Sequence, residues 1–356
     1  MNGKSDPPLL VVRAESGKDL GTGHVMRMLA LAQGWQDVGG RAVFLFAQAN
    51  EAMSQRLEKE LCAVTVLHEI PGSKGDAEAT TRFLRTHPAA WVAVDGYNFD
   101  QAYLMTLTES KVPVLVMTDY PHAEKFPVAA LLNQNPPVRT DEYAARAPGT
   151  SLLLGLQYVL LRREFRAWSQ RRPLRSGRVS RLLVTMGGAD PDNVTERVVS
   201  ALKGVLPANI QVTIVVGAQN VHGAKVKRAA HEAGLNFQYL ERVEDMPALL
   251  SECDLAVCAA GATCWELAFM GVPMLAVILA QNQEPLAAAV ERLGCGVNLG
   301  WHHQLDATKA AQMTAGLVKD SARLAAMARC GQALVDGGGT ERVVNFLRQY
   351  KDQLPS

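Results

Sequence analysis

Short apolar runs rich in β-branched residues alternate with segments of helical periodicity along nearly the whole chain of 356 residues. Some runs, such as Val-Pro-Val-Leu-Val-Met at 112–117, are apolar without a break, which is typical of strands buried on both faces of a parallel sheet. The alternation therefore predicts an α/β protein with doubly wound sheets. The predicted strands are 9–12, 42–47, 64–67, 91–95, 112–118, 130–133, 182–185, 211–216, 237–240, 255–258, 274–278 and 297–299.

A change in composition divides this pattern into two halves. Residues 166–180 are basic and lack apolar periodicity, which predicts a solvated linker rather than a nucleic-acid patch. We therefore expect one Rossmann-like domain at 1–165, a second at 181–338, and a C-terminal helix at 339–356 that can pack back on the first domain. Ligands bind at the carboxyl ends of strands in open α/β sheets, so the two domains are predicted to face each other across a cleft.

Charge and cysteine content exclude several classes of protein. The sum of Lys and Arg is 36 against 35 for Asp and Glu, so the chain lacks the cationic excess of a nucleic-acid binder. Its start has no apolar core of a secretory signal, and no apolar run reaches the ~20 residues of a membrane span, so a cytoplasmic protein is expected. The six cysteines form no CxxC pair, which favours buried reduced thiols over a metal site.

The first motif that points to chemistry follows the first predicted strand. Gly21-Thr22-Gly23-His24 opens a helix there, and its glycines allow a ligand to approach the backbone closely. A helix amino terminus favours an anion and also the neutral imidazole that a general base needs, so His24 is a candidate base. The alternative is a plain glycine turn with a packed histidine, since the third Gly of a dinucleotide fingerprint is missing.

A glycine pair, Gly187-Gly188, follows the first strand of the second half. Asp190 and Asp192 come next, in a spacing that some sugar transferases use for a metal ion. A helix cap by Asp192 or Asn193 is the better interpretation, so no metal or cofactor is predicted.

A second loop of small residues follows the strand at 255–258. Gly261, Ala262 and Thr263 lead into a helix whose free N–H groups and hydroxyl can face a diphosphate. Glu266 lies one turn further on, where its carboxylate can accept hydrogen bonds from a ribose diol. Its alternative role is in a capping box with Thr263.

The strand at 274–278 is followed by an amide-rich segment, Gln281-Asn282-Gln283. Amide side chains at a strand's carboxyl end suit sugar hydroxyls and N-acetyl groups. The alternative is a helix cap by Asn282.

Six motifs taken in order resemble a known family: GTGHVMRMLALA, VDGYNFD, LLGLQYVLLRREF, VTMGGADPDNVT, AAGATCWELAFMGVPMLAVILAQNQ and DGGGTERVV. The family is that of the nucleotide-sugar hydrolases of pseudaminic acid biosynthesis, which act on UDP-2,4-diacetamido-2,4,6-trideoxy-β-L-altropyranose, and of related spore-coat polysaccharide proteins. The resemblance covers nearly the whole chain, and it also extends to the lipid II-forming N-acetylglucosaminyltransferase.

This resemblance implies a GT-B fold in which the second domain binds UDP and the first carries a catalytic base. It places the base on His24. Substrate contacts fall on Gly21, Gly23, Arg27, Tyr97, Asn282 and Gln283, and nucleotide contacts on Gly187, Gly188, Gly261, Ala262, Thr263 and Glu266. The chain departs from the family pattern at Arg13-Ala14-Glu15 and at Thr118-Asp119-Tyr120, positions expected on the sugar side.

The function expected from the resemblance is hydrolysis of a UDP-linked acetamido-deoxy sugar at its anomeric carbon. UDP is a good leaving group, so one base that activates water suffices, with inversion and without a metal. A GT-B glycosyltransferase that uses a UDP-amino sugar is the alternative. A non-catalytic UDP-sugar binding protein, which would have no need of His24, is a third possibility.

Overall fold

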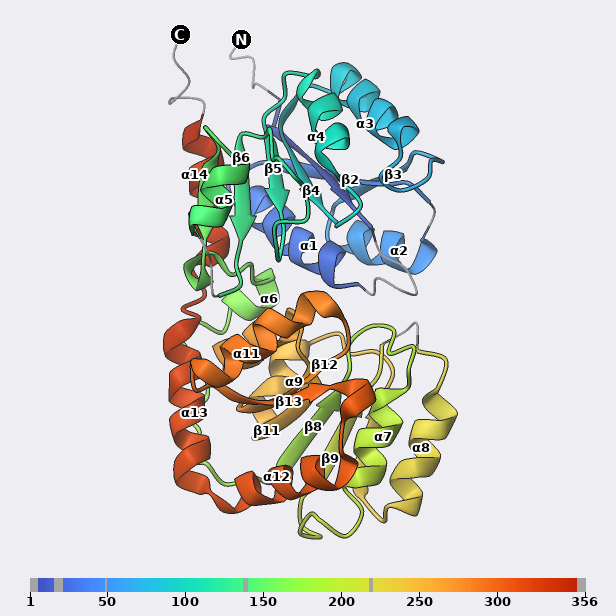
Figure 1. The fold of residues 1–356 in the computed structure, drawn as a ribbon, viewed down its shortest axis with the longest axis vertical. Coiled ribbons are helices and arrows are strands. Elements are labelled where there is room, and N and C mark those ends of the chain that lie inside the picture. The colour runs from blue at the N-terminus through green and yellow to red at the C-terminus, as the bar shows by residue number, and fades with distance from the viewer. Residues whose placement is uncertain (1–5, 16–21, 49, 137–139, 218–219, 351–356) are drawn as a thin grey trace. The chain divides into compact units, whose positions relative to one another are not determined.

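A computed structural model of the chain describes residues 6–15, 22–48, 50–136, 140–217 and 220–350, which form two compact α/β units (Figure 1). Unit 1 comprises Met1–Gly17, His24–Arg163 and Gly338–Ser356, and unit 2 comprises Lys18–Gly23 and Glu164–Gly337. The predicted class, α/β with two Rossmann-like domains, is confirmed. The cleft expected between the domains stays a prediction.

Within the described residues, unit 1 contains a seven-stranded sheet in the order β3-β2-β1-β4-β5-β6-β7, and every neighbouring pair is parallel. Its direction of winding reverses between β1 and β4, the place where ligands bind in sheets of this type. The strands are β1 (Leu9–Ala14), β2 (Arg41–Phe46), β3 (Ala63–Val66), β4 (Ala89–Asp95), β5 (Val114–Met117), β6 (Ala130–Asn133) and β7 (Ser151–Leu154).

Helices connect these strands, and side chains that cap their amino termini help to set where they start. Asp100, for example, accepts a hydrogen bond from the backbone N–H of Tyr103 at the start of α4. The C-terminal helix belongs to this unit, where Val343 and Leu347 join the core and the Leu347 carbonyl accepts from the Trp91 indole. The helices are α1 (Gly23–Asp37), α2 (Glu51–Lys59), α3 (Lys74–Thr86), α4 (Gln101–Thr108), α5 (Thr140–Arg146), η1 (Leu156–Tyr158), α6 (Arg163–Arg166, at the unit boundary) and α14 (Gly339–Gln349).

Unit 2 contains, in its described part, a six-stranded parallel sheet in the order β10-β9-β8-β11-β12-β13, which reverses between β8 and β11. The strands are β8 (Arg181–Thr185), β9 (Gln211–Val215), β10 (Asn236–Leu240), β11 (Leu255–Ala259), β12 (Met274–Ile278) and β13 (Gly296–Trp301). The helices are α7 (Val194–Ala201), α8 (Gly223–Glu232), α9 (Met246–Glu252), α10 (Thr263–Met270), η2 (Gln281–Gln283), α11 (Glu284–Arg292), η3 (His302–Gln304), α12 (Ala307–Lys319) and α13 (Ser321–Leu334).

Every predicted strand is present, but the expectation of a solvated basic segment at 166–180 is wrong for two of its arginines. The Arg172 guanidinium donates to the carbonyls of Gln332 and Val335, and that of Arg175 donates to those of Leu250 and Ser251. These carbonyls lie at the carboxyl ends of helices, where four acceptors lack partners within the helix and a cation is favoured. Both arginines therefore hold unit 2 together.

All six cysteines are free thiols, and five of them are buried. No helix in the described part of the chain is long and apolar enough to cross a membrane.

Candidate active site

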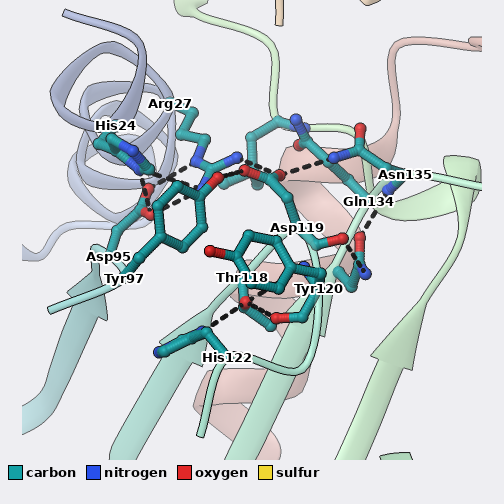
Figure 2. Close-up of polar contacts among 12 residues, drawn as sticks. His24, Arg27, Asp95, Tyr97, Thr118, Asp119, Tyr120, His122, Gln134 and Asn135 are labelled. Atoms are coloured by element: carbon teal, nitrogen blue, oxygen red, sulfur yellow. Dashed lines mark hydrogen bonds and ion pairs between the residues drawn. The ribbon is translucent and has the colours of Figure 1, made fainter. Parts of the chain in front are cut away.

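Polar side chains gather at the carboxyl ends of four neighbouring strands in unit 1 (Figure 2). His24 and Arg27 lie at the start of α1, which follows β1, and Asp95 is the last residue of β4. Asp119 follows β5, and Asn135 follows β6. Because parallel strands end at the same edge of a sheet, these residues meet although up to 111 positions separate them in the sequence (24 to 135).

His24 is paired with a buried carboxylate. Its Nδ1 atom lies 2.7 Å from Oδ1 of Asp95, which is fully buried. Burial alone would raise the pKa of Asp95, but the charge of Arg27 and the hydrogen bonds from Arg27 and His24 outweigh it and lower that pKa to about 2. Asp95 is thus a carboxylate that can only accept, so Nδ1 donates to it, and in the neutral form of the ring Nε2 carries the free electron pair.

Arg27 lies between two carboxylates and compensates the negative charge of each. Its Nε and Nη2 atoms donate to Asp95 over 2.6 and 2.7 Å, and its Nη1 atom donates to Asp119 over 2.6 Å. The side chain is almost completely buried, and burial would lower its pKa, but the two carboxylates raise it well above the ordinary value. This geometry shows Arg27 held by two carboxylates, and the substrate contact that the sequence suggests for it stays a prediction.

Asp119 connects this ion pair to Tyr97 and Asn135. One oxygen accepts from Asn135 over 2.6 Å as well as from Arg27, and the other accepts from the Tyr97 hydroxyl. Burial, followed by the negative charge of Asp119, raises the pKa of Tyr97 well above its ordinary value. The Tyr97 ring also packs edge-on against the His24 ring, with centroids 5.1 Å apart. The predicted residues His24, Arg27 and Tyr97 are therefore brought together.

A separate buried ion pair braces the end of β1. Arg13 donates to both carboxylate oxygens of Asp76, over 3.0 and 2.6 Å, and lies 2.6 Å from Glu15. Glu15 in turn accepts from the backbone N–H of Ala47, one residue after β2. Arg13 and Glu15 lie where the chain departs from the family pattern, and together they help to hold the ends of β1 and β2 in place.

The glycine pair of unit 2 lies between β8 and a helix whose amino terminus is already capped. Gly187 has a φ of +83°, a conformation that favours glycine. Asp190 accepts from the backbone N–H groups of Val194 and Thr195 over 2.8 and 2.9 Å. The expected cap by Asp192 or Asn193 is therefore wrong, because Asn193 makes no side-chain cap bond and Asp190 takes that role.

The loop after β11 leads into α10 without a side-chain cap. The residue at the cap position is Ala262, so the alternative of a capping box between Thr263 and Glu266 is wrong. A Cβ atom at Gly261 would meet no atom within 4 Å, so packing of the chain itself does not require glycine there. Both Thr263 and Glu266 are half-buried, at the start of the helix. That a diphosphate binds at this amino terminus stays a prediction.

The amide segment after β12 forms the short helix η2. The Gln283 carboxamide oxygen accepts from the backbone N–H of Leu279 over 2.9 Å, and Gln283 rather than Asn282 stands at the cap position of α11, with no side-chain cap bond. The alternative of a helix cap by Asn282 is thus wrong. Asn282 is half-buried. Gly21 lies outside the described residues, and Gly23 is the first residue of α1.

Sequence reasoning does not single out Asp95 and Asn135. A signal is present, because both are polar residues that end or follow apolar runs, the pattern by which catalytic side chains reach the edge of a parallel sheet. Which strand ends are neighbours depends on the strand order, and the pattern of one sequence does not reveal that order.

Comparison with known proteins supports the fold. Residues 182–337 match the family model "Glycosyltransferase family 28 C-terminal domain". The chain is 25% identical to the spore coat polysaccharide biosynthesis protein SpsG of Bacillus subtilis, over 96% of this chain and 98% of that protein. A solved structure, MurG of Acinetobacter baumannii, superposes with a TM-score of 0.67 at 18% identity, over 96% of this chain and 100% of that chain. The predicted GT-B fold is confirmed.

A further relative is the UDP-N-acetylglucosamine--N-acetylmuramyl-(pentapeptide) pyrophosphoryl-undecaprenol N-acetylglucosamine transferase of a Nocardioides species. It is 29% identical to this chain over 281 residues, which are 74% of this chain and 73% of that enzyme. The chain is thus similar both to a protein of polysaccharide biosynthesis and to a glycosyltransferase.

Proposed function

We propose that this protein is a UDP-sugar hydrolase that releases a free acetamido- or diacetamido-deoxy sugar and UDP. The observation that carries the proposal is the pairing of His24 Nδ1 with the buried Asp95 carboxylate, 2.7 Å apart, at the carboxyl edge of the sheet. A histidine oriented in this way by a carboxylate is the arrangement that enzymes use to remove a proton from an oxygen nucleophile.

In the reaction, His24 Nε2 takes a proton from a water molecule whose oxygen attacks the anomeric carbon. The bond from that carbon to the UDP oxygen breaks, and its electron pair leaves with UDP. Asp95 stabilises the imidazolium that forms and keeps the ring in one orientation. Attack opposite the leaving group inverts the anomeric configuration, as in inverting glycosidases. No acid is required, because UDP leaves as a stable anion.

Unit 2 supplies the nucleotide contacts in this proposal. The amino terminus of α10, with Gly261, Ala262 and Thr263, accepts the diphosphate, and Glu266 accepts hydrogen bonds from the ribose. Gly187 and Gly188 let the nucleotide approach the backbone after β8, and Asn282 contacts the sugar or its acetamido group. The transferase relative uses a UDP-N-acetyl sugar by its name, which supports UDP and an acetamido group as the recognised features.

The biological context proposed is surface polysaccharide or nonulosonic acid biosynthesis, of the pseudaminic type. The match to a spore coat polysaccharide biosynthesis protein, which extends over 96% of this chain, supports that context.

A second candidate function is a glycosyltransferase in which a sugar hydroxyl takes the place of water. The match of residues 182–337 to a glycosyltransferase domain and the similarity to a transferase favour it. The chemistry at His24 is the same in both cases, since each needs a base that removes a proton from an attacking oxygen.

The test is incubation of the purified full chain with UDP-, GDP- and CMP-linked acetamido sugars in the absence of any acceptor, followed by NMR of the products. The proposal expects UDP and a free sugar of inverted anomeric configuration. Turnover only after addition of a sugar acceptor would instead identify a transferase, and consumption of GDP- or CMP-sugars alone would refute the UDP assignment.

A further inference from the structure

An aromatic cluster made of Tyr97, Tyr120 and His122 lies next to the proposed base. The Tyr97 and Tyr120 rings are 4.8 Å apart between centroids and tilted by 31°, and both pack edge-on against His122, at 5.8 and 6.1 Å. The Tyr97 ring also contacts His24, so the cluster extends directly from the base (Figure 2).

Contacts made by the Thr118 side chain hold the segment that carries Tyr120 in place. The Thr118 hydroxyl donates to the Tyr120 carbonyl, and Thr118 Oγ1 lies 2.9 Å from Nδ1 of His122. The His122 ring packs in turn against the buried Phe126. Tyr120 is therefore presented by a braced connection between β5 and β6.

Tyr120 is the most exposed residue of this cluster. The Tyr97 and His122 side chains are half-buried, whereas Tyr120 is 38% exposed. The Tyr97 hydroxyl donates to Asp119, so Tyr97 is part of the ion-pair network. Tyr120 is thus the ring of the cluster that keeps the most surface free beside a site built mainly from polar and charged groups.

We infer that Tyr120 is a specificity-determining residue that selects sugars with an apolar, hydroxyl-poor face. The inference rests on the proposed function, because it assumes that a sugar lies beside His24. An aromatic face attracts C–H groups and gains from burying apolar surface, whereas a sugar hydroxyl placed against it loses hydrogen bonds to water. The ring therefore favours a deoxy sugar, in which a methyl group replaces a hydroxymethyl group.

The experiment compares two UDP-linked N-acetyl sugars that differ only at C6, one with a hydroxymethyl group and one with a methyl group. Both are tested on the full chain as wild type, Tyr120→Phe and Tyr120→Ala, with UDP alone as the reference ligand. KM and kcat are measured for turnover. Dissociation constants are measured by calorimetry with the same Tyr120 changes in a His24→Ala background, so that binding is measured without relying on turnover.

Wild type is expected to prefer the deoxy sugar by about 3- to 10-fold, because the hydroxyl of the other sugar loses hydrogen bonds to water when it lies against the ring. Tyr120→Phe should keep that preference, and Tyr120→Ala should lose it, with a KM about 3- to 10-fold higher, an unchanged kcat and unchanged affinity for UDP. Those unchanged values separate a lost sugar contact from a misfolded site.

Each remaining outcome decides one of the two proposals. If neither sugar is hydrolysed but binding still shows a preference that depends on Tyr120, the specificity role holds and the hydrolase proposal fails. If turnover proceeds and Tyr120→Ala keeps the wild-type preference, the specificity role is refuted and the hydrolase proposal stands. Failure of both sugars to bind more tightly than UDP, or a wild type without preference, also refutes the role of Tyr120.

Discussion

His24 Nδ1 donates to Oδ1 of Asp95 over 2.7 Å, and this one hydrogen bond determines which nitrogen of the ring is free to act as a base. Replacing the carboxylate by a carboxamide, Asp95→Asn, keeps the shape but allows the wrong tautomer. We expect kcat for UDP-sugar turnover to fall by about 10²- to 10⁴-fold, as in triads that lose their carboxylate.

The affinity of the Asp95→Asn variant for UDP serves as the control, measured by calorimetry. It should stay within a few-fold of wild type, because the proposed nucleotide contacts lie in unit 2. A variant that keeps full kcat would show that the pair is structural only.

Arg27 is predicted to be required for folding rather than for binding UDP. The Arg27→Met substitution would leave Asp95 and Asp119 buried without a compensating charge, which costs about 3–5 kcal/mol of unfolding free energy. Denaturant unfolding measures this loss. Adding Asp95→Asn and Asp119→Asn to the same chain should recover part of it, whereas a direct contact between Arg27 and UDP predicts weakened UDP binding and normal stability.

Acid should weaken the fold through Asp95 in a defined pH window. Its pKa in the folded chain, about 2, lies below the ordinary value, so its contribution is complete above pH ~4 and is lost as pH falls toward 2. The loss amounts to about 2–3 kcal/mol. The difference in unfolding free energy between wild type and Asp95→Asn, measured from pH 5 to 2, should shrink accordingly, and a constant difference would contradict the assignment.

Arg172 is predicted to stabilise unit 2, although it lies in the segment at 166–180 whose sequence predicts a solvated linker. The Arg172→Ala substitution removes hydrogen bonds from a charged donor to the Gln332 and Val335 carbonyls. An unfolding free energy lower by about 1.5–3 kcal/mol is expected. The exposed Arg178 offers a matched control, since Arg178→Ala should change stability by less than ~0.5 kcal/mol. Equal effects of the two substitutions would show that the segment is merely solvated.

The sequence allows the fold to be predicted well because strands buried on both faces need uninterrupted apolar residues. β6 (Ala130–Asn133), for instance, is found at its predicted bounds. The strand β7 (Ser151–Leu154), with its sequence Ser-Leu-Leu-Leu, is not among the predicted strands. The helices α12 and α13 are separated at Asp320, whose side chain caps α13.

The candidate site could be predicted only in part. His24 follows a glycine loop and is visible as local sequence, as are the residues from Gly261 to Glu266. The ion pairs of Arg27 with Asp95 and Asp119 join positions 68 and 92 residues apart. Such pairings follow from strand order and from the need to compensate buried charge, and local patterns contain neither.

The central claim is that His24 is the base, and the rate of UDP-sugar turnover by His24→Asn, measured by NMR beside the affinity for UDP, tests it most directly. The account predicts that turnover is abolished while the UDP dissociation constant stays within a few-fold of wild type. Turnover at the wild-type rate by this variant would contradict the account.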